Sequence, residues 1–162
     1  MKRILVAGIG NIFFGDDAFG CEVTSELIRR GMPDGVTVRD FGIRGYDLAY
    51  AMMGAYDATV LIDASPRGDK PGTVYTLELD SVTLDNDQSE VADAHNLTPV
   101  RVLQLVHSLG GTVQNLYLVG CEPGMIEPME GEMGLSEHVR NAVEPAAEMV
   151  EQLVKKLLAQ VK

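Results

Sequence analysis

The chain has 162 residues, of which 46% are hydrophobic and 23% are charged, and its formal net charge is −11. This length and composition suit one globular domain with a full hydrophobic core, so we interpret residues 1–162 as a single domain. The acidic balance excludes nucleic acid and anionic membrane surfaces as expected partners, because both require a basic surface.

The first half of the chain alternates predicted strands with predicted helices. An apolar run at 4–7 that ends at glycine predicts a buried strand, and 16–30 predicts a helix that begins on aspartates and stops at Gly31. A second strand is expected at 36–41, a short helix at 46–53 and a third, almost wholly apolar strand at 58–63.

The second half continues this alternation after a loop at 64–72. We expect an alternating, edge-type strand at 73–79, mostly loop at 80–96, and a helix at 98–109 that Thr98 and Pro99 begin. A strand at 116–119, a loop at 122–134 and helices at 136–143 and 145–161 complete the chain. The alternation predicts an α/β fold with a mostly parallel sheet covered on both faces, and functional groups at the carboxyl ends of its strands.

Two cysteines, Cys21 and Cys121, lie a hundred residues apart and form no Cys-x-x-Cys motif. This sparse usage favours a reducing compartment over a disulfide framework, and each thiol is expected to serve as a small buried side chain. No apolar window approaches the length of a membrane span. We therefore expect a soluble, cytoplasmic protein.

The stretch ILVAGIGNIFFGDDAFG begins like a dinucleotide-binding loop, with Gly8 and Gly10 in place. The third glycine of the G-x-G-x-x-G motif is replaced by Phe13, and a phosphate at the helix start would meet Asp16 and Asp17. Unit charges 4 Å apart repel by about 4 kcal/mol in partly buried surroundings, which disfavours a pyrophosphate. We expect Asp16 to cap the helix and Asp17 to be functional.

Acidic side chains follow three of the expected strands. Asp17 comes after the first strand, Asp40 ends the second, Asp63 ends the third, and His95 precedes the helix that begins at Thr98. Carboxylates and imidazole are suitable ligands for a divalent transition metal such as nickel or zinc. The structural alternatives are that Asp63 accepts hydrogen bonds from loop amides and that His95 only supports the fold. Two further histidines at 107 and 138 are interpreted as surface or packing residues.

Several segments resemble the hydrogenase maturation proteases, the endopeptidases that trim the C-terminal extension of the nickel-iron hydrogenase large subunit. The matching segments run in family order over nearly the whole chain: GIGNIFFGDDAFG, LIDAS with PGTV, DAHNLTPVRVL, LVGCEP and GLSEHVRNAVEPAAEMV. The first segment, with Gly-x-Gly-Asn followed by Asp-Asp, is the most specific.

The resemblance implies a three-layer α/β/α sandwich around a twisted, mostly parallel five-stranded sheet. It also implies that Asp17, Asp63 and His95 bind a metal, with glutamate in some members where this chain has Asp17. The metal would be the nickel already seated in the hydrogenase precursor, although a surrogate divalent ion could bind the isolated protein. The protease would recognise this nickel only after its insertion is complete, and would then cut the precursor after a histidine or arginine near the last cysteine motif.

The catalytic step is expected to use a carboxylate that activates water, because the sequence contains neither His-Glu-x-x-His nor a Ser-His-Asp or Cys-His arrangement. The candidate catalytic residues are Asp17 and Asp40; a structural role for Asp40 in the turn at 42–45 is the alternative. The loop at 122–134, with Met125, Met129 and Met133, offers an adaptable surface for the precursor.

The resulting hypothesis is a hydrogenase maturation endopeptidase that is a monomer when free. Two alternatives stay open at this stage: a ligand- or nucleotide-binding α/β domain without protease activity, and a nickel-carrying or scaffolding accessory protein that docks without cutting.

Overall fold

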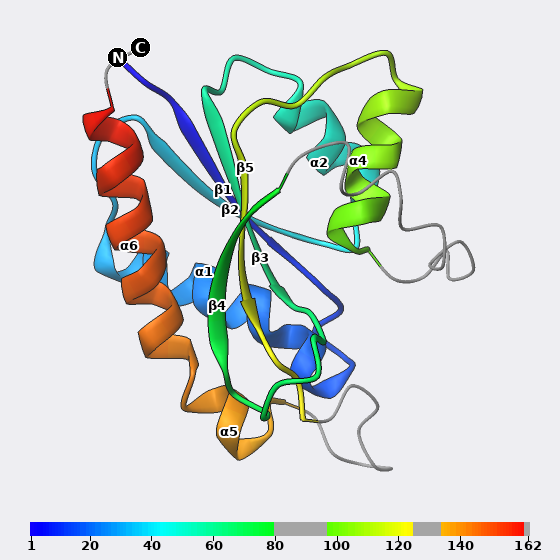
Figure 1. Cartoon of the computed structure of the whole chain (residues 1–162), viewed down its shortest axis with the longest axis vertical. Helices are drawn as coiled ribbons and strands as arrows, with labels where there is room; N and C mark the ends of the chain where they lie inside the picture. Colours follow the sequence, from blue (N-terminus) through cyan, green and yellow to red (C-terminus); the bar gives the residue numbers. More distant parts are fainter. Residues whose placement is uncertain (80–96, 125–133, 161–162) are drawn as a thin grey trace.

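The computed structural model describes residues 1–79, 97–124 and 134–160 (Figure 1). None of the helices in these residues is both long and apolar enough to cross a membrane. In chain order the elements are β1 (Ile4–Ile9), the 3₁₀ turn η1 (Gly15–Ala18), α1 (Phe19–Arg30), β2 (Val36–Gly42), α2 (Gly45–Met52), β3 (Ala58–Ala64), β4 (Val74–Leu79), α4 (Pro99–Ser108), β5 (Leu116–Cys121), α5 (Glu137–Arg140) and α6 (Val143–Ala159).

The five strands form one sheet in the order β2-β1-β3-β5-β4. Neighbours from β2 to β5 pair in parallel, while β4 pairs antiparallel with β5 and forms an edge. The expected mostly parallel, five-stranded sheet is confirmed. The chain passes from β1 to β2 on one side and then to β3 on the other, so the switch in strand order lies between β1 and β3.

Helices cover both faces of the sheet, with α1 and α6 on one side and α2 and α4 on the other (Figure 1). Within β1, Ile4 and Val6 pack toward α1 and α6, whereas Leu5 and Ala7 pack toward α2 and α4. Successive residues of a strand point to opposite faces, so a strand covered on both must be apolar throughout. This arrangement is the three-layer α/β/α sandwich expected from the sequence.

The start of α4 was predicted correctly from the sequence, whereas the start of α1 was not. The hydroxyl of Thr98 accepts a hydrogen bond from the Arg101 amide at 3.2 Å, and Pro99 opens α4, as expected. The helix expected over 16–30 instead begins with a 3₁₀ turn, and its α-helical part starts at Phe19. Asp16 and Asp17 therefore lie in a tighter turn ahead of α1.

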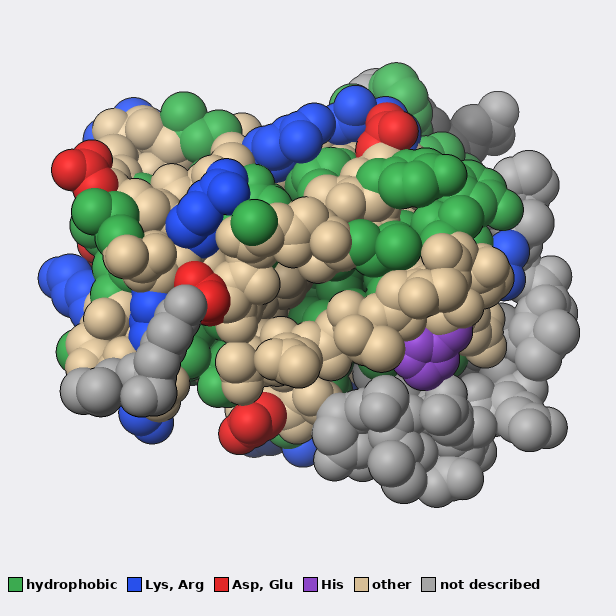
Figure 2. Space-filling model, turned by 90° about the horizontal axis from the view of Figure 1, so that it is seen from above, with side chains coloured by type: hydrophobic (Ala, Val, Ile, Leu, Met, Phe, Trp, Pro, Cys, Tyr) green, Lys and Arg blue, Asp and Glu red, His purple; other side chains and the backbone are tan. Residues whose placement is uncertain are grey.

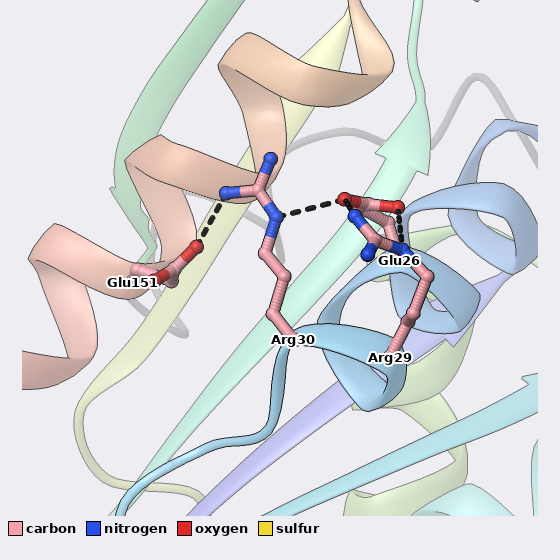
Figure 3. Close-up of polar contacts among 4 residues, drawn as sticks. All are labelled: Glu26, Arg29, Arg30 and Glu151. Atoms are coloured by element: carbon pink, nitrogen blue, oxygen red, sulfur yellow. Dashed lines mark hydrogen bonds and ion pairs between the residues drawn. The ribbon is translucent and has the colours of Figure 1, made fainter.

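An ionic cluster connects α1 to α6 on the outer side of the sandwich (Figure 3). Arg30 contacts Glu151 of α6 at 2.6 Å and Glu26 of its own helix at 2.8 Å. Hydrogen bonds from Arg29 and Arg30 lower the pKa of Glu26 to about 2. The cluster fixes the relative orientation of the two helices, although exposed ion pairs of this kind contribute little free energy.

Close backbone contact at two glycines seats the start of α1 on the sheet. A Cβ atom on Gly20 would lie 2.5 Å from the carbonyl oxygen of Ile9 and 2.6 Å from that of Ile62. A Cβ on Gly8, within β1, would lie 2.6 Å from the carbonyl oxygen of Gly20. The helix can approach the ends of β1 and β3 only because neither glycine carries a side chain.

Gly20→Ala is expected to destabilise the protein by about 1–3 kcal/mol, the range of overpacked sites. Intrinsic helix propensity has the opposite sign, because alanine is favoured over glycine in a helix by about 1 kcal/mol. Urea unfolding followed by circular dichroism measures the difference. A variant more stable than the wild type would show that the backbone contact has no steric importance.

Candidate functional site

The expected acidic residues lie at one end of the sheet. Asp17 follows β1 in η1, Asp63 is the next-to-last residue of β3, and Asp40 lies near the carboxyl end of β2. β1 is hydrogen-bonded to both β2 and β3, so the three carboxylates belong to adjacent strand ends around the switch in strand order. This is the position at which open α/β sheets bind ligands.

The glycine loop holds the carboxylate of Asp17. Gly10 has a φ of +126°, and a Cβ there would lie 2.1 Å from the carbonyl oxygen of Asp17. The Asn11 amide donates to Asp17 Oδ2 at 2.7 Å, and the Phe13 amide donates to Asn11 Oδ1 at 2.9 Å. The loop therefore directs an amide to a carboxylate of this chain, where a dinucleotide loop would direct it to a phosphate.

The environment of Asp17 raises the pKa of its carboxyl above the ordinary value. Burial raises the pKa of this carboxyl, and the hydrogen bond from the Asn11 amide only partly opposes the rise. A nearby cation would reverse this effect by stabilising the charged form. The half-buried carboxylate is thus an electrostatically costly group, a property typical of functional positions.

Asp63 is buried at the end of β3, with 4% of its surface exposed. It pairs in register with Gly120 of β5, where a Cβ atom would lie 2.4 Å from the Tyr75 ring. Burial raises the pKa of Tyr75, and the negative charge of Asp63 adds to the rise. The Tyr75 hydroxyl donates to the Ser65 carbonyl at 2.6 Å and so fixes the chain just after Asp63.

Asp40 makes contacts that hold the turn after β2. Its Oδ1 accepts a hydrogen bond from the Gly42 amide at 3.0 Å, and its carbonyl oxygen accepts one from Arg44 at 2.7 Å. These contacts agree with the structural role that the sequence left open for it. Asp40 also lies close to α1, where it raises the pKa of the Cys21 thiol.

Both cysteines are free and strongly protonated. Burial, together with the hydrogen bond to Asp40, raises the pKa of Cys21 to about 12, and burial raises the pKa of Cys121 to about 12. Since the thiolate is the reactive form, alkylation at pH 8 should be roughly a hundredfold slower in the native protein than in urea, once the greater nucleophilicity of a thiolate with a higher pKa is included.

Asp40→Asn is expected to accelerate alkylation of Cys21 and to leave Cys121, whose neighbours do not include Asp40, unchanged. Iodoacetamide labelling with peptide mass spectrometry follows both thiols in one sample. Equal rates for Cys21 in the variant and the wild type would contradict the contact with Asp40.

The prediction that Asp16 caps the helix is wrong. No side-chain cap bond is present at the start of η1 or α1, and Asp16 is fully buried. Its carboxylate accepts hydrogen bonds from the Gly124 amide at 2.8 Å, the Ser136 amide at 2.6 Å and the Ser136 hydroxyl at 2.8 Å. Asp16 instead connects the turn that carries Asp17 to Gly124 and Ser136, which lie more than a hundred residues further along the chain.

Sequence reasoning also missed how Glu122 shapes the loop after β3. The buried carboxylate accepts hydrogen bonds from the Arg67 amide at 2.6 Å and the Gly68 amide at 3.2 Å. The Arg67 guanidinium in turn lies 4.3 Å from the centre of the Tyr75 ring. A charged residue directly after a buried strand was the available signal, since such a residue needs partners.

His95 and the three methionines at 125, 129 and 133 lie outside the described residues. Within the described ranges, no three His, Cys, Asp or Glu side chains form a group that could hold a metal ion. The roles of Asp17, Asp63 and His95 as metal ligands, and of Asp17 and Asp40 in catalysis, therefore stay predictions.

A cavity of about 430 Å³ lies at the opposite end of the sheet from the carboxylates. Lys2, Ile4, Ala58 and Asn115 are among the residues that line it, and none of the candidate site residues does. The acidic residues instead lie at the carboxyl ends of the strands.

Comparison with known proteins gives consistent matches. Residues 21–153 match the family model described as hydrogenase maturation protease. A putative hydrogenase maturation protease of Methanocaldococcus jannaschii is 36% identical over 159 residues, covering 96% of this chain and 98% of the relative. The hydrogenase 2 maturation protease of Escherichia coli is 34% identical over 150 residues, covering 91% and 88%. The solved structure of the hydrogenase maturating endopeptidase HybD from E. coli aligns with a TM-score of 0.77 at 30% identity, covering 96% and 93%.

Proposed function

Because the chain belongs to the hydrogenase maturation protease family, and is therefore an endopeptidase, we propose that it trims the large-subunit precursor of a nickel-iron hydrogenase. The removed part would be the C-terminal extension. The observation that carries this proposal is the pair of acids, Asp17 and Asp63, at the adjacent ends of β1 and β3.

The nickel in the precursor is the proposed recognition signal. Asp17 and Asp63 would supply carboxylate oxygens and His95 an imidazole nitrogen, a ligand set suited to a divalent transition metal. The raised pKa of Asp17 supports this role, since a bound cation would restore the charge that burial disfavours. In this proposal the ion belongs to the substrate, and the acids contact it only when the precursor is seated.

Peptide hydrolysis would use a water activated by a carboxylate. Asp17 and Asp40 are the candidates, and metal polarisation of the scissile carbonyl would assist. Asp40→Asn keeps the shape of the turn after β2, since the amide oxygen can still accept from Gly42. Cleavage by this variant at the wild-type rate would remove Asp40 from the catalytic proposal.

Parallel incubations with nickel-loaded and nickel-free precursor test the proposed signal. Intact-mass spectrometry should show loss of a short C-terminal peptide only in the loaded sample. Equal cleavage of both forms would refute nickel recognition but keep the protease activity. Calorimetric titration of the isolated protein with nickel adds an independent check, since submicromolar affinity would mean that the protein holds its own metal.

We infer that the protein acts in the cytoplasm and is a monomer when free. The two free thiols, Cys21 and Cys121, support a reducing compartment. Light scattering after size exclusion would test the monomer directly.

A further inference from the structure

The short helix α2 is apolar on two faces. Leu48, Ala49 and Met52 are buried against the sheet and α4. The other face carries Tyr46 and Tyr50, which are 59% and 61% exposed, and Ile43 and Met53 flank the helix at its two ends with 50% and 36% of their surfaces exposed. A helix of this kind normally buries one stripe and exposes polar side chains on the other. The second stripe therefore needs an explanation beyond the fold.

Figure 2 views the molecule from the end of the sheet opposite the strand carboxyl ends, and hydrophobic side chains gather there on the side where α2 and α4 lie. Large exposed apolar areas on soluble proteins are typical of interaction sites, because water hydrates them at a cost in free energy.

The stripe on α2 is continuous with the turn that carries Asp17. The amide of Gly10 donates to the carbonyl of Gly42 at 2.9 Å, which places the segments after these two glycines side by side. The first segment exposes three further apolar residues, with Phe13 63%, Ile12 45% and Phe14 43% exposed. The amide of Asp17 donates to the Phe14 carbonyl at 3.0 Å. We call these seven residues the apolar strip: Ile12, Phe13, Phe14, Ile43, Tyr46, Tyr50 and Met53.

Arg44 adjoins the strip as the sequence neighbour of Ile43 and the N-cap of α2, although the chain has a formal net charge of −11. The guanidinium groups of Arg39 and Arg44 lie 4.6 Å and 5.9 Å from the centre of the Phe41 ring. Arg44 contacts Asp47 at 3.7 Å. A complementary partner would therefore present apolar side chains with acidic groups at their edge.

We propose that the apolar strip docks the folded body of the protein substrate, while the carboxylates act on its C-terminal segment. This inference rests on the proposed function. A cut peptide must lie across the turn that carries Asp17, so the rest of the substrate covers the surface next to that turn. A second copy of this chain bound to the strip would cover the same turn and exclude the substrate.

The test uses a double variant, Tyr46→Glu with Tyr50→Glu, which places two charges on the exposed side of α2. With nickel-loaded precursor, KM should rise at least about tenfold, and kcat should change less than about twofold, since both tyrosines lie outside the catalytic groups. The matched control is Ile28→Glu on α1, where the replaced side chain is also 61% exposed. The control should leave both constants unchanged.

Direct calorimetric binding to the precursor separates this inference from the proposed function. If the wild type binds the precursor without cutting it, and the double variant binds it at least about tenfold more weakly, the docking proposal is supported and the proposed function fails. An unchanged KM and an unchanged affinity for the precursor overturn the docking proposal. An equal rise in KM or an equal loss of affinity in the Ile28→Glu control also overturns it. A wild-type dimer that the double variant converts to monomer also overturns it, because the strip would then be an interface between copies.

Discussion

Asp17→Asn is expected to slow cleavage of the precursor by about 10²–10⁴-fold, the range measured when a positioned acid or base is lost. The substitution removes the negative charge but keeps an oxygen that can accept from the Asn11 amide, so the glycine loop should keep its shape. Asp63→Asn should have a comparable effect if both acids serve one ion. Intact-mass spectrometry of the precursor over time gives the rates, and circular dichroism verifies that each variant is folded.

Two matched variants sharpen this experiment. Asp34→Asn makes the same chemical change at an exposed position in the loop after α1, and it should cleave at the wild-type rate. Asp17→Glu keeps the negative charge on a side chain one methylene longer, so it should keep measurable activity. An Asp17→Asn variant as active as the wild type would remove Asp17 from the site.

Asp16→Asn is expected to destabilise the fold by about 2–4 kcal/mol, although Asp16 is the immediate neighbour of Asp17. The fully buried carboxylate accepts three hydrogen bonds, and an amide can accept on one side only. At least one donor from Gly124 or Ser136 would then lose its partner, and a buried donor without a partner costs about 1–3 kcal/mol, in addition to the stronger bonding that a charged acceptor provides. Chemical denaturation gives the free energy of unfolding.

Ser136→Ala provides the milder comparison, because it removes only the hydroxyl bond and keeps the bond from the Ser136 amide. Its expected cost is about 1 kcal/mol. If Asp16→Asn unfolds at the same denaturant concentration as the wild type, the three hydrogen bonds do not contribute as described. The Ser136→Ala result keeps the test decisive if the asparagine variant does not fold.

Most of the sheet could be predicted because β1, β3 and β5 are short apolar runs and β4 alternates in the manner of an edge strand. The run at 58–63 is covered on both faces of the sheet, so nearly all of its residues must be apolar, and this pattern is visible in the sequence. The role of Asp16 could not be predicted in the same way. Its partners lie 108 and 120 residues away, and an aspartate ahead of a helix looks locally like a cap.

The site was predictable to the extent that it follows the rule of strand ends. Asp17, Asp40 and Asp63 all lie where parallel strands finish, as that rule requires. The rule cannot distinguish an acid that holds a turn from one that acts on a substrate. The contact of Asp40 with Gly42 is the turn role that the sequence left open, whereas its effect on Cys21 became evident only from the packing of β2 against α1.

The anchoring of Gly124 and Ser136 to a single buried carboxylate has a consequence for engineering. Gly124 and Ser136 contact the same carboxylate, so these two positions are held together and the residues between them can be exchanged as a unit, or cassette, with fixed end points. Doubling the length of such an insert costs only about 0.6 kcal/mol in closure entropy. Cassettes exchanged between relatives at these two residues should therefore graft onto this scaffold without disturbing the acids beside it.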